Sequence, residues 1–377
     1  MHLVDTTLFY SPTSGGVKRY LNAKHAWLRS HTAWQHSIVV PGSEDRLERG
    51  GLCFVRGPRL PGTFNYRLPL NPRHWSRVLD SLEPDLIEAG DSFHPAWCGW
   101  RVSERRGIPL VAFYHSDLPQ IIGARMGRLT ERALERYLRW LYSHCDAVFA
   151  PSRIMCAYLR SLGIARAIYQ PLGVDAQLFC PERRTLDVRA ALGLPAQARV
   201  LLFAGRLALE KNLPVLLDAF ALLGRPYHLV LIGGGRAIRP AANVTVLPYR
   251  SDGRELASWI ASADALVHAG TRETFGLVIL EAMACGRPVV AVRSGAVPEL
   301  VDESVGVLAE PLSASSMAAA IASLYERDLD ALGRAARAHV LRQFTWSRAF
   351  HIQTAAYTSL VAARRISLAL PSATELG

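Results

Sequence analysis

The fold is most clearly marked by the stretch Glu273-Thr-Phe-Gly-Leu-Val-Ile-Leu-Glu281, which continues as Ala-Met-Ala-Cys-Gly286-Arg-Pro288-Val-Val. A short apolar run at 266–268 and a polar loop at 270–272 precede it. The pattern predicts a strand, a loop and then a helix that begins near Phe275 and ends at Gly286, before Pro288. Strand, loop and helix in this order are typical of parallel α/β folds.

Short apolar, β-branched runs alternate with helical periodicity along the rest of the chain. The alternation predicts Rossmann-like, doubly wound parallel sheets, and about eleven strands are too many for one such sheet. We therefore expect two α/β domains, at 1–170 and 171–345, whose strand ends face a ligand-binding cleft. Strands are expected at 2–4, 37–40, 86–88, 110–114, 147–150, 167–170, 200–204, 228–232, 244–246, 265–268 and 288–292, and helices at 17–28, 131–143, 213–223 and 315–326.

Composition narrows the class of protein. The chain has 377 residues, of which 50% are hydrophobic and 20% charged, and this argues against disorder or a coiled coil. No apolar stretch reaches the ~18–20 residues of a membrane span, and no signal peptide is apparent, so we expect a soluble, cytoplasmic protein. The six cysteines are scattered without a Cys-x-x-Cys pair, which argues against a disulfide framework or a zinc site.

The charge of the chain suggests phosphate-bearing partners. The formal net charge is +11, and residues 1–170 hold 22 Arg and Lys against 14 Asp and Glu. A basic half of this kind suits nucleotides, anionic lipid surfaces or nucleic acid. Binding to nucleic acid is disfavoured because the aromatic residues fall within apolar, core-like runs. Only three of the 43 basic residues are lysines.

The two glutamates of the Glu-x₇-Glu stretch can bind a hydroxyl-rich anion. If the stretch is helical, Glu273 and Glu281 lie roughly 12 Å apart. Free amides at the helix start, at Phe275, Gly276 and Leu277, point into the space between them. A ligand whose phosphates bind these amides and whose hydroxyls donate to the two carboxylates has the shape of a sugar nucleotide diphosphate. An ordinary capped helix with exposed glutamates explains the spacing equally well.

Two loops that follow strands carry further phosphate-binding features. Arg206 and Lys211 follow the strand that ends at Gly205, and two cations at such an edge can clamp a diphosphate. Asn212 is expected to cap the next helix. Gly15 and Gly16 open a helix after Ser11-Pro-Thr-Ser, and their bare backbone allows close approach of a phosphate. A third loop, Gly233-Gly-Gly235, lacks the last glycine of a dinucleotide fingerprint, because that position is Ile238.

Polar residues in the first half suggest contacts with an acceptor. His115 and Asp117 follow the strand at 110–114, although a lone histidine at a strand end is more often structural. Five arginines recur at three- and four-residue steps and form one stripe if the segment is helical. The stripe suits anionic lipid or an acceptor phosphate, but nearby Glu131 and Glu135 favour a solvated face. The five arginines are Arg125, Arg128, Arg132, Arg136 and Arg139.

Taken together, these residues resemble the retaining glycosyltransferases of family 4, which have the GT-B fold. The resemblance is specific over about 171–310, through Pro171-Leu-Gly-Val-Asp175, Gly205-Arg206 with Lys211, the Glu-x₇-Glu stretch and Gly286-x-Pro-Val-Val. It is weaker in the first half and at Phe344-Thr-Trp346. There the family pattern implies a helix at 346–365 that crosses back to the first domain, followed by a tail at 366–377.

The resemblance implies a role for each matched residue. Arg206 and Lys211 bind the donor diphosphate, Glu273 meets the sugar hydroxyls, and Glu281 takes the ribose. The resemblance also implies that the backbone amides of Phe275, Gly276 and Leu277 lie close to the sugar hydroxyls that Glu273 meets.

In the first domain, the resemblance implies that Gly16, beside Gly15, approaches a phosphate and that His115 lies by the anomeric centre. The implied reaction is metal-independent transfer of a hexose with retention of configuration, completed by domain closure. The sequence departs from the family at His268-Ala-Gly270, where Pro-Ser is frequent, and this leaves the local donor contacts open.

The donor, the acceptor and two alternative activities stay open. The His115-x-Asp117 pattern favours GDP-mannose over UDP-glucose, and the base is expected near residues 248–252. The acceptor is expected to be a glycan or a lipid-linked intermediate. Asp117, Arg125, Arg128 and Arg132 are candidates for acceptor contact or for peripheral contact with an anionic membrane. A nucleotide-sugar epimerase is the main alternative, and a nicotinamide oxidoreductase is less favoured because of the missing glycine.

Overall fold

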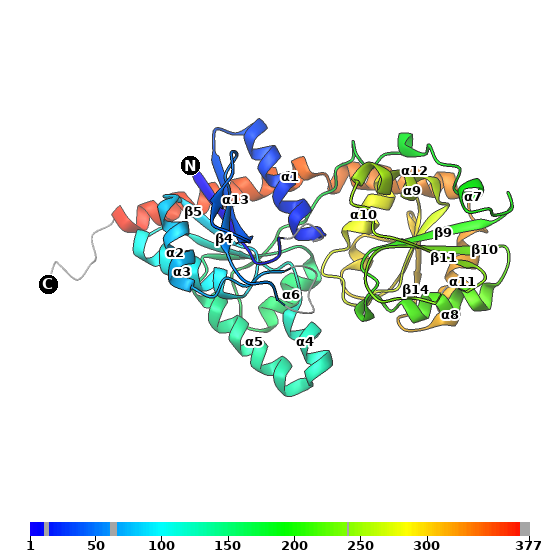
Figure 1. The fold of residues 1–377 in the computed structure, drawn as a ribbon, viewed down its shortest axis with the longest axis horizontal. Helices are drawn as coiled ribbons and strands as arrows, with labels where there is room; N and C mark the ends of the chain where they lie inside the picture. The colour runs from blue at the N-terminus through cyan, green and yellow to red at the C-terminus, as the bar shows by residue number, and fades with distance from the viewer. Residues whose placement is uncertain (11–14, 61–65, 240, 370–377) are drawn as a thin grey trace. The chain divides into compact units, whose positions relative to one another are not determined.

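The structure is a computed structural model that describes residues 1–10, 15–60, 66–239 and 241–369. The chain forms two compact units (Figure 1). The first unit consists of Met1–Pro171 and Ala349–Gly377, and the second of Leu172–Arg348. Ser11–Ser14 of the expected glycine loop and residues 370–377 of the expected tail lie outside the described residues.

The first unit is built on an eight-stranded sheet in the order β3-β4-β2-β1-β5-β6-β7-β8. Neighbouring strands are parallel except β3 and β4 at the edge. Its strands are β1 (His2–Thr6), β2 (Gln35–Gly42), β3 (Arg46–Leu47), β4 (Leu52–Arg56), β5 (Leu86–Ala89), β6 (Leu110–Phe113), β7 (Ala147–Ala150) and β8 (Ala167–Tyr169).

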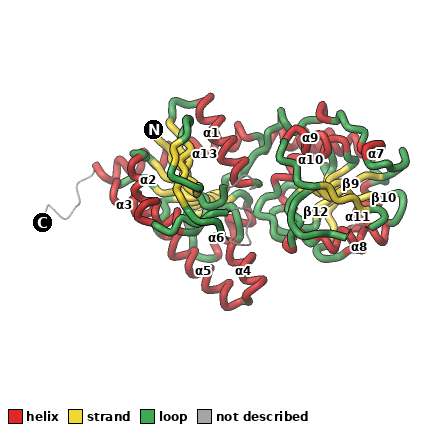
Figure 2. Tube along the Cα trace, in the orientation of Figure 1, coloured by secondary structure: helices red, strands yellow, loops and turns green. Residues whose placement is uncertain are grey.

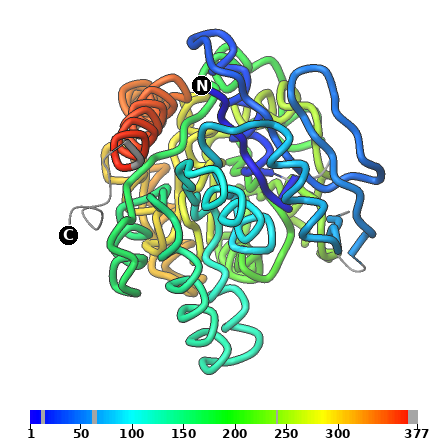
Figure 3. The backbone as a smooth tube through the Cα atoms, turned by 90° about the vertical axis from the view of Figure 1, so that its left-hand side faces the viewer, coloured from blue at the N-terminus to red at the C-terminus, as the bar shows by residue number. Residues whose placement is uncertain are grey.

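Helices cover the sheet of the first unit (Figure 2), and several of them bury apolar side chains in its core, among them Trp75, Val102, Leu141 and Leu159. Helices α4 and α5 pack against each other as a hairpin that projects from the sheet, as Figures 1 and 3 show. Asn71, Asp117 and Ser152 cap the N-termini of α2, α4 and α6 with their side chains. The helices are α1 (Gly16–His31), α2 (Pro72–Ser81), α3 (His94–Arg106), α4 (Leu118–Met126), α5 (Arg128–Ser143), α6 (Arg153–Ser161) and α13 (Trp346–Ala369), which enters this unit at Ala349.

The second unit has a six-stranded, fully parallel sheet in the order β11-β10-β9-β12-β13-β14. Helices α8 and α11 lie on one side of this sheet, and α9, α10 and α12 lie on the other (Figure 1). The strands are β9 (Arg199–Ala204), β10 (Tyr227–Ile232), β11 (Val244–Leu247), β12 (Ala265–His268), β13 (Val289–Val292) and β14 (Gly306–Ala309). The helices are α7 (Val188–Ala191), α8 (Leu213–Leu223), α9 (Gly253–Ser262), α10 (Leu277–Ala284), α11 (Ala314–Leu324) and α12 (Leu329–Gln343), with 3₁₀ turns at η1 (Pro181–Arg183), η2 (Leu209–Lys211) and η3 (Val297–Glu299).

The prediction of two doubly wound parallel α/β sheets is confirmed. The strands β3, β4 and β14 were not expected, because each is short or lies beside glycines that weaken the apolar pattern. Among the described helices, none combines the length and the apolar character that crossing a membrane requires.

The arginine stripe is not one continuous helical face, and this corrects the sequence interpretation. Gly127 has a φ of 89° and separates α4 from α5, so Arg125 lies on α4 and the other four arginines lie on α5. A φ in this range ends one helix and turns the chain before the next.

Candidate functional site

The loop after β9 carries the two expected phosphate ligands in different environments. The side chain of Arg206 is 61% exposed, and its Nη2 lies 3.0 Å from Oε1 of Glu210. Lys211 ends η2 and is largely buried against Glu273. The loop therefore presents one exposed guanidinium at the surface and one largely buried ammonium that already contacts a carboxylate.

Lys211, Glu273 and His268 form a cluster at the carboxyl edge of the second sheet. The Nζ of Lys211 contacts Oε1 of Glu273, and Nε2 of His268 lies 2.9 Å from the same oxygen. The three side chains come from η2, the end of β12 and the loop after β12. Adjacent parallel strands end at the same edge, which brings these loops together.

Electrostatics keep Glu273 ionised. Burial alone would raise the pKa of this carboxyl, but the Lys211 charge and the His268 contact outweigh burial and hold the pKa of Glu273 well below its ordinary value. A carboxylate that is fixed and ionised can accept hydrogen bonds from hydroxyl groups of a ligand.

The helix start at Glu273-Thr-Phe-Gly differs from the expectation. Helix α10 begins at Leu277 because Gly276, with a φ of 102°, is its N-cap. The ring of Phe275 is buried and lies edge-on against Phe344, with ring centroids 5.9 Å apart. The amides that open the helix are those of Leu277 and Val278, since the Ile279 amide donates to the Gly276 carbonyl.

Glu281 lies on the buried side of α10, with 3% of its surface exposed. The estimate of ~12 Å between the two glutamates assumed one helix from 273 to 281. That assumption is wrong, because residues 273–276 are not helical. The alternative of two exposed helix-surface glutamates is equally wrong, since Glu281 is buried and Glu273 is paired.

Asn212 does not cap α8 with its side chain, contrary to the expectation. Its backbone is left-handed, with a φ of 47°. The side-chain amide donates to the Ala269 carbonyl at 3.0 Å and to Oγ1 of Thr271 at 3.1 Å. Asn212 therefore fastens the Lys211 loop to the loop that precedes Glu273.

His115 follows β6 in the first unit and lines a pocket. Its ring stacks on Phe113 with centroids 4.1 Å apart, and burial lowers its pKa to about 3. The imidazole is therefore neutral near pH 7 and suits hydrogen bonding better than proton donation as a cation. Phe9, Asp91, Phe93 and Tyr142 also line this pocket.

Asp117 has a structural role in this conformation. Its Oδ1 accepts hydrogen bonds from the Tyr114 hydroxyl at 2.9 Å and from the Gln120 amide at 3.2 Å, which caps α4. Burial raises the pKa of Asp117, with the two donors opposing the rise. The structure thus directs this side chain into the protein, whereas the sequence suggested contact with an acceptor.

The remaining expected residues lie at helix starts or on the surface of the first unit. Gly15 precedes α1 and has open space where a Cβ would stand, and Gly16 is the first residue of that helix. Arg125, Arg128 and Arg132 are exposed at the tip of the α4–α5 hairpin.

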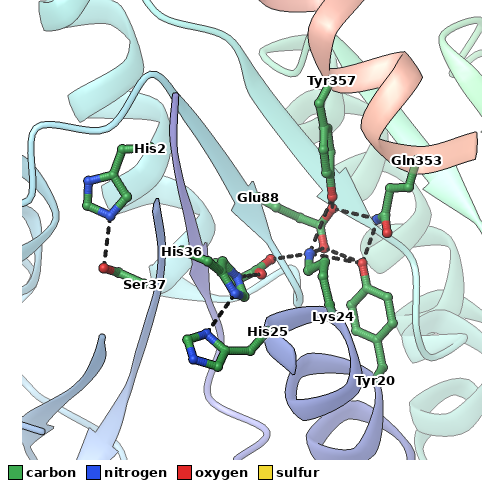
Figure 4. Close-up of polar contacts among 10 residues, drawn as sticks. His2, Tyr20, Lys24, His25, His36, Ser37, Glu88, Gln353 and Tyr357 are labelled. Atoms are coloured by element: carbon green, nitrogen blue, oxygen red, sulfur yellow. Dashed lines mark hydrogen bonds and ion pairs between the residues drawn. The ribbon is translucent and has the colours of Figure 1, made fainter. Parts of the chain in front are cut away.

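Sequence reasoning missed a buried charge cluster in the first unit (Figure 4). The Nζ of Lys24 lies 2.7 Å from Oδ1 of Asp5, 2.8 Å from Oε1 of Glu88 and 3.0 Å from the Tyr20 hydroxyl. All four side chains are almost fully buried. Burial raises the pKa of both carboxyls, and the Lys24 charge opposes that rise.

The cluster extends to α13 and to two histidines. Gln353 and Tyr357 of α13 both donate to Oε2 of Glu88. On the other side, Nε2 of His36 lies 2.5 Å from Oδ2 of Asp5, and its Nδ1 lies 3.1 Å from Nδ1 of His25. The cluster therefore joins β1, α1, β2, β5 and α13.

A signal for both clusters was present in the sequence. Two of the three lysines, Lys24 and Lys211, lie in these clusters, whereas nearly all other basic residues are arginines. A compact ammonium can satisfy several converging acceptors at one point, which a planar guanidinium does less well. Scarce lysine in an arginine-rich chain was therefore a marker of buried charge.

Two family models match the chain. The model described as Glycosyltransferase Family 4 matches residues 14–178, and the model described as Glycosyl transferases group 1 matches residues 198–327.

Two named relatives and one solved structure align with most of this chain. A GDP-mannose-dependent alpha-(1-6)-phosphatidylinositol dimannoside mannosyltransferase of Mycobacterium tuberculosis is 31% identical over 369 residues, which cover 93% of this chain and 94% of the relative. A GDP-mannose-dependent alpha-mannosyltransferase of the same species is 31% identical over 74% of this chain and 75% of its own length. Among solved structures, sucrose-phosphate synthase from Thermosynechococcus elongatus has a TM-score of 0.83 at 24% identity, covering 96% of this chain and 99% of that one.

Proposed function

The chain belongs to glycosyltransferase family 4, and from that membership we propose that it transfers mannose from GDP-mannose to a hydroxyl group of a lipid-linked acceptor. The chain is an enzyme with the GT-B fold that uses a nucleotide sugar. The observation that carries the finer proposal is the match over more than nine-tenths of both chains to a relative whose name specifies GDP-mannose and phosphatidylinositol dimannoside. The relatives are named as transferases, which does not favour the epimerase alternative.

The second unit supplies the groups that we propose for the donor. Arg206 and Lys211 neutralise the diphosphate, and the amides that open α10 add hydrogen-bond donors. Arg206 can turn from Glu210 to a ligand at little cost, because exposed ion pairs contribute about 0–1 kcal/mol. Glu273 accepts hydrogen bonds from the sugar hydroxyls.

We propose a reaction that retains configuration and needs no metal ion. The bond between the anomeric carbon and the diphosphate oxygen breaks, and the acceptor oxygen bonds to the same face of that carbon. The leaving phosphate takes the proton of the acceptor hydroxyl. Arg206, Lys211 and the start of α10 stabilise the charge on the departing nucleotide, so catalysis is mainly positioning and electrostatics. His115, neutral near pH 7, is proposed to hydrogen-bond a sugar hydroxyl.

Glu281 is proposed for the ribose hydroxyls. Because its side chain is buried, removal of the whole side chain would leave a cavity and perturb the fold as well as nucleotide binding. Glu281→Gln keeps the volume and is the cleaner probe of this role.

The donor can be identified by thermal shift with GDP-mannose, UDP-glucose and ADP-glucose. We expect GDP-mannose to raise the melting temperature most, because a ligand at a hundredfold excess over Kd stabilises the native state by about 2.7 kcal/mol. A larger shift with UDP-glucose would reassign the donor. No shift with any of the three, for protein with native circular dichroism, would contradict the proposed donor class.

The hairpin tip, defined as Arg125, Met126, Arg128, Leu129 and Arg132, is proposed to contact an anionic membrane that holds the acceptor. Met126 and Leu129 are 69% and 83% exposed, and the three arginines beside them are also exposed. Exposed apolar side chains among basic ones are suited to the surface of an anionic bilayer.

Charge reversal at the tip tests this contact. Each basic residue near an anionic surface contributes about 1 kcal/mol, so Arg128→Glu with Arg132→Glu should weaken sedimentation with phosphatidylglycerol vesicles by at least about 30-fold. The matched control is Arg73→Glu with Arg77→Glu, two exposed arginines of α2. If both pairs weaken binding equally, or if the unmodified protein does not bind, the arginines of the tip are only a solvated surface.

A further inference from the structure

The departure from the family pattern at His268-Ala-Gly270 lies directly beside Glu273. His268 is the last residue of β12, and its side chain is 1% exposed. Its ring is parallel to that of Phe203 at a centroid distance of 6.0 Å. The ring is therefore held by packing while Nε2 reaches Oε1 of Glu273 at 2.9 Å.

The geometry determines which ring nitrogen carries the hydrogen. Nδ1 of His268 is buried and has no hydrogen-bond partner in the described part of the chain. A hydrogen on Nδ1 would be an unsatisfied buried donor, and Nε2 would then direct a lone pair at a carboxylate oxygen. The tautomer with hydrogen on Nε2 avoids both costs and donates to Glu273.

The two carboxylate oxygens of Glu273 have different surroundings. His268 and Lys211 both approach Oε1. Within residues 15–60, 66–239 and 241–369, no hydrogen bond or ion pair involves Oε2. The carboxylate is thus held through one oxygen and keeps the other available as an acceptor.

Gly270 provides the space that this arrangement needs. A Cβ at position 270 would lie 2.9 Å from Nε2 of His268 and 3.3 Å from Oε1 of Glu273. The backbone at Gly270 is not left-handed, so the requirement for glycine here comes from space alone. A side chain at position 270 would press on the His268–Glu273 pair, so this pairing requires a glycine there.

We propose that His268 is a positioning residue that orients Glu273 toward the sugar of the donor. The imidazole fixes Oε1 together with Lys211, which directs Oε2 to the sugar hydroxyls. This inference rests on the proposed function and deepens it, because it assigns the sugar-recognising geometry to a residue outside the common family pattern.

Calorimetric titration of the full chain with GDP and with GDP-mannose separates positioning from a general structural effect. His268→Leu should weaken GDP-mannose roughly 10- to 100-fold, the effect of losing a hydrogen bond to a charged group, and leave GDP within about twofold. His268→Gln, whose amide N–H can reach Glu273, should restore most of the loss. Equal weakening of both ligands, or no weakening, overturns the proposal.

Gly270→Ala provides a second variant in which His268 is intact. Its new Cβ should displace the imidazole from Glu273 and reproduce the selective loss of GDP-mannose affinity. Circular dichroism and melting temperature confirm that each variant is folded. If the panel of nucleotide sugars identifies another donor, the same comparison uses that sugar nucleotide and its parent nucleotide.

Nitrogen NMR of the unliganded protein distinguishes failure of this inference from failure of the proposed function. The imidazole shifts of His268 should report hydrogen on Nε2 near pH 7, and Glu273→Gln should change them. Hydrogen on Nδ1 would overturn the inference even if GDP-mannose binds. Hydrogen on Nε2 in a protein that binds no nucleotide sugar would overturn the proposed function and leave the Glu273–His268 pairing supported.

Discussion

Lys24→Met is expected to lower the free energy of unfolding of the first unit by about 3–5 kcal/mol. The methionine fills a similar volume but leaves Asp5 and Glu88 buried without a counter-charge. Removal of one partner from a buried ion cluster costs more than the pair itself contributes, because the remaining charge stays desolvated. Urea unfolding followed by tryptophan fluorescence measures the change, since six of the eight tryptophans lie in the first unit.

The control for this variant is Lys18→Met on the same helix. Lys18 lies over the ring of Tyr10 at 5.5 Å, a cation–π contact that contributes about 0.5–1 kcal/mol at such sites. We therefore expect a change of no more than about 1 kcal/mol. Equal destabilisation by the two variants would show that the buried cluster has no special importance for stability.

Lys211→Ala is expected to lower kcat/KM for the donor by about 10²–10³-fold, comparable to the loss of one hydrogen-bond donor from an oxyanion hole. The ammonium has two proposed tasks: it neutralises the diphosphate, and it holds Glu273 together with His268. The variant should therefore weaken donor binding as well as turnover. Initial rates over a range of GDP-mannose concentrations separate the two effects.

Two comparisons make the Lys211 prediction decisive. Glu303→Gln, at an exposed glutamate of the same unit, should leave the rates unchanged. Glu273→Gln should lower kcat/KM, and the double variant should lose less than the sum of the two single losses, because the residues act as a pair. Turnover at the normal rate in Lys211→Ala would refute the site assignment.

The sheets were predictable because most of their strands are continuous apolar runs. Ala265–His268 and Ala147–Ala150, for example, are strands with the expected bounds. The start of α10 was not predictable, because the left-handed backbone of Gly276 places the helix boundary two residues later than the periodicity suggests. Asn212 likewise resembles a helix cap, but tertiary contacts with Ala269 and Thr271 compete successfully for its amide.

The polar clusters were harder to predict than the sheets. The Lys24 cluster combines side chains from positions 5, 20, 24, 36, 88, 353 and 357, and no local spacing links such distant residues. For the proposed donor site, the sequence identified Lys211 and Glu273 separately. The structure adds the contact between these two side chains and the contact of His268 with Glu273. The roles of these residues in binding and turnover stay predictions.

The return of α13 to the first unit has a consequence for biosynthesis. The second unit is one uninterrupted segment, Leu172–Arg348, whereas the first is completed by residues from Ala349 onward. Glu88 acquires its hydrogen bonds from Gln353 and Tyr357 only after residues 353–357 have left the ribosome. Until then the nascent first half lacks two of the donors to its buried carboxylate, while the segment translated after it can already be complete. We therefore expect the first unit to reach its final structure after the second, the reverse of the usual order of domain folding during translation.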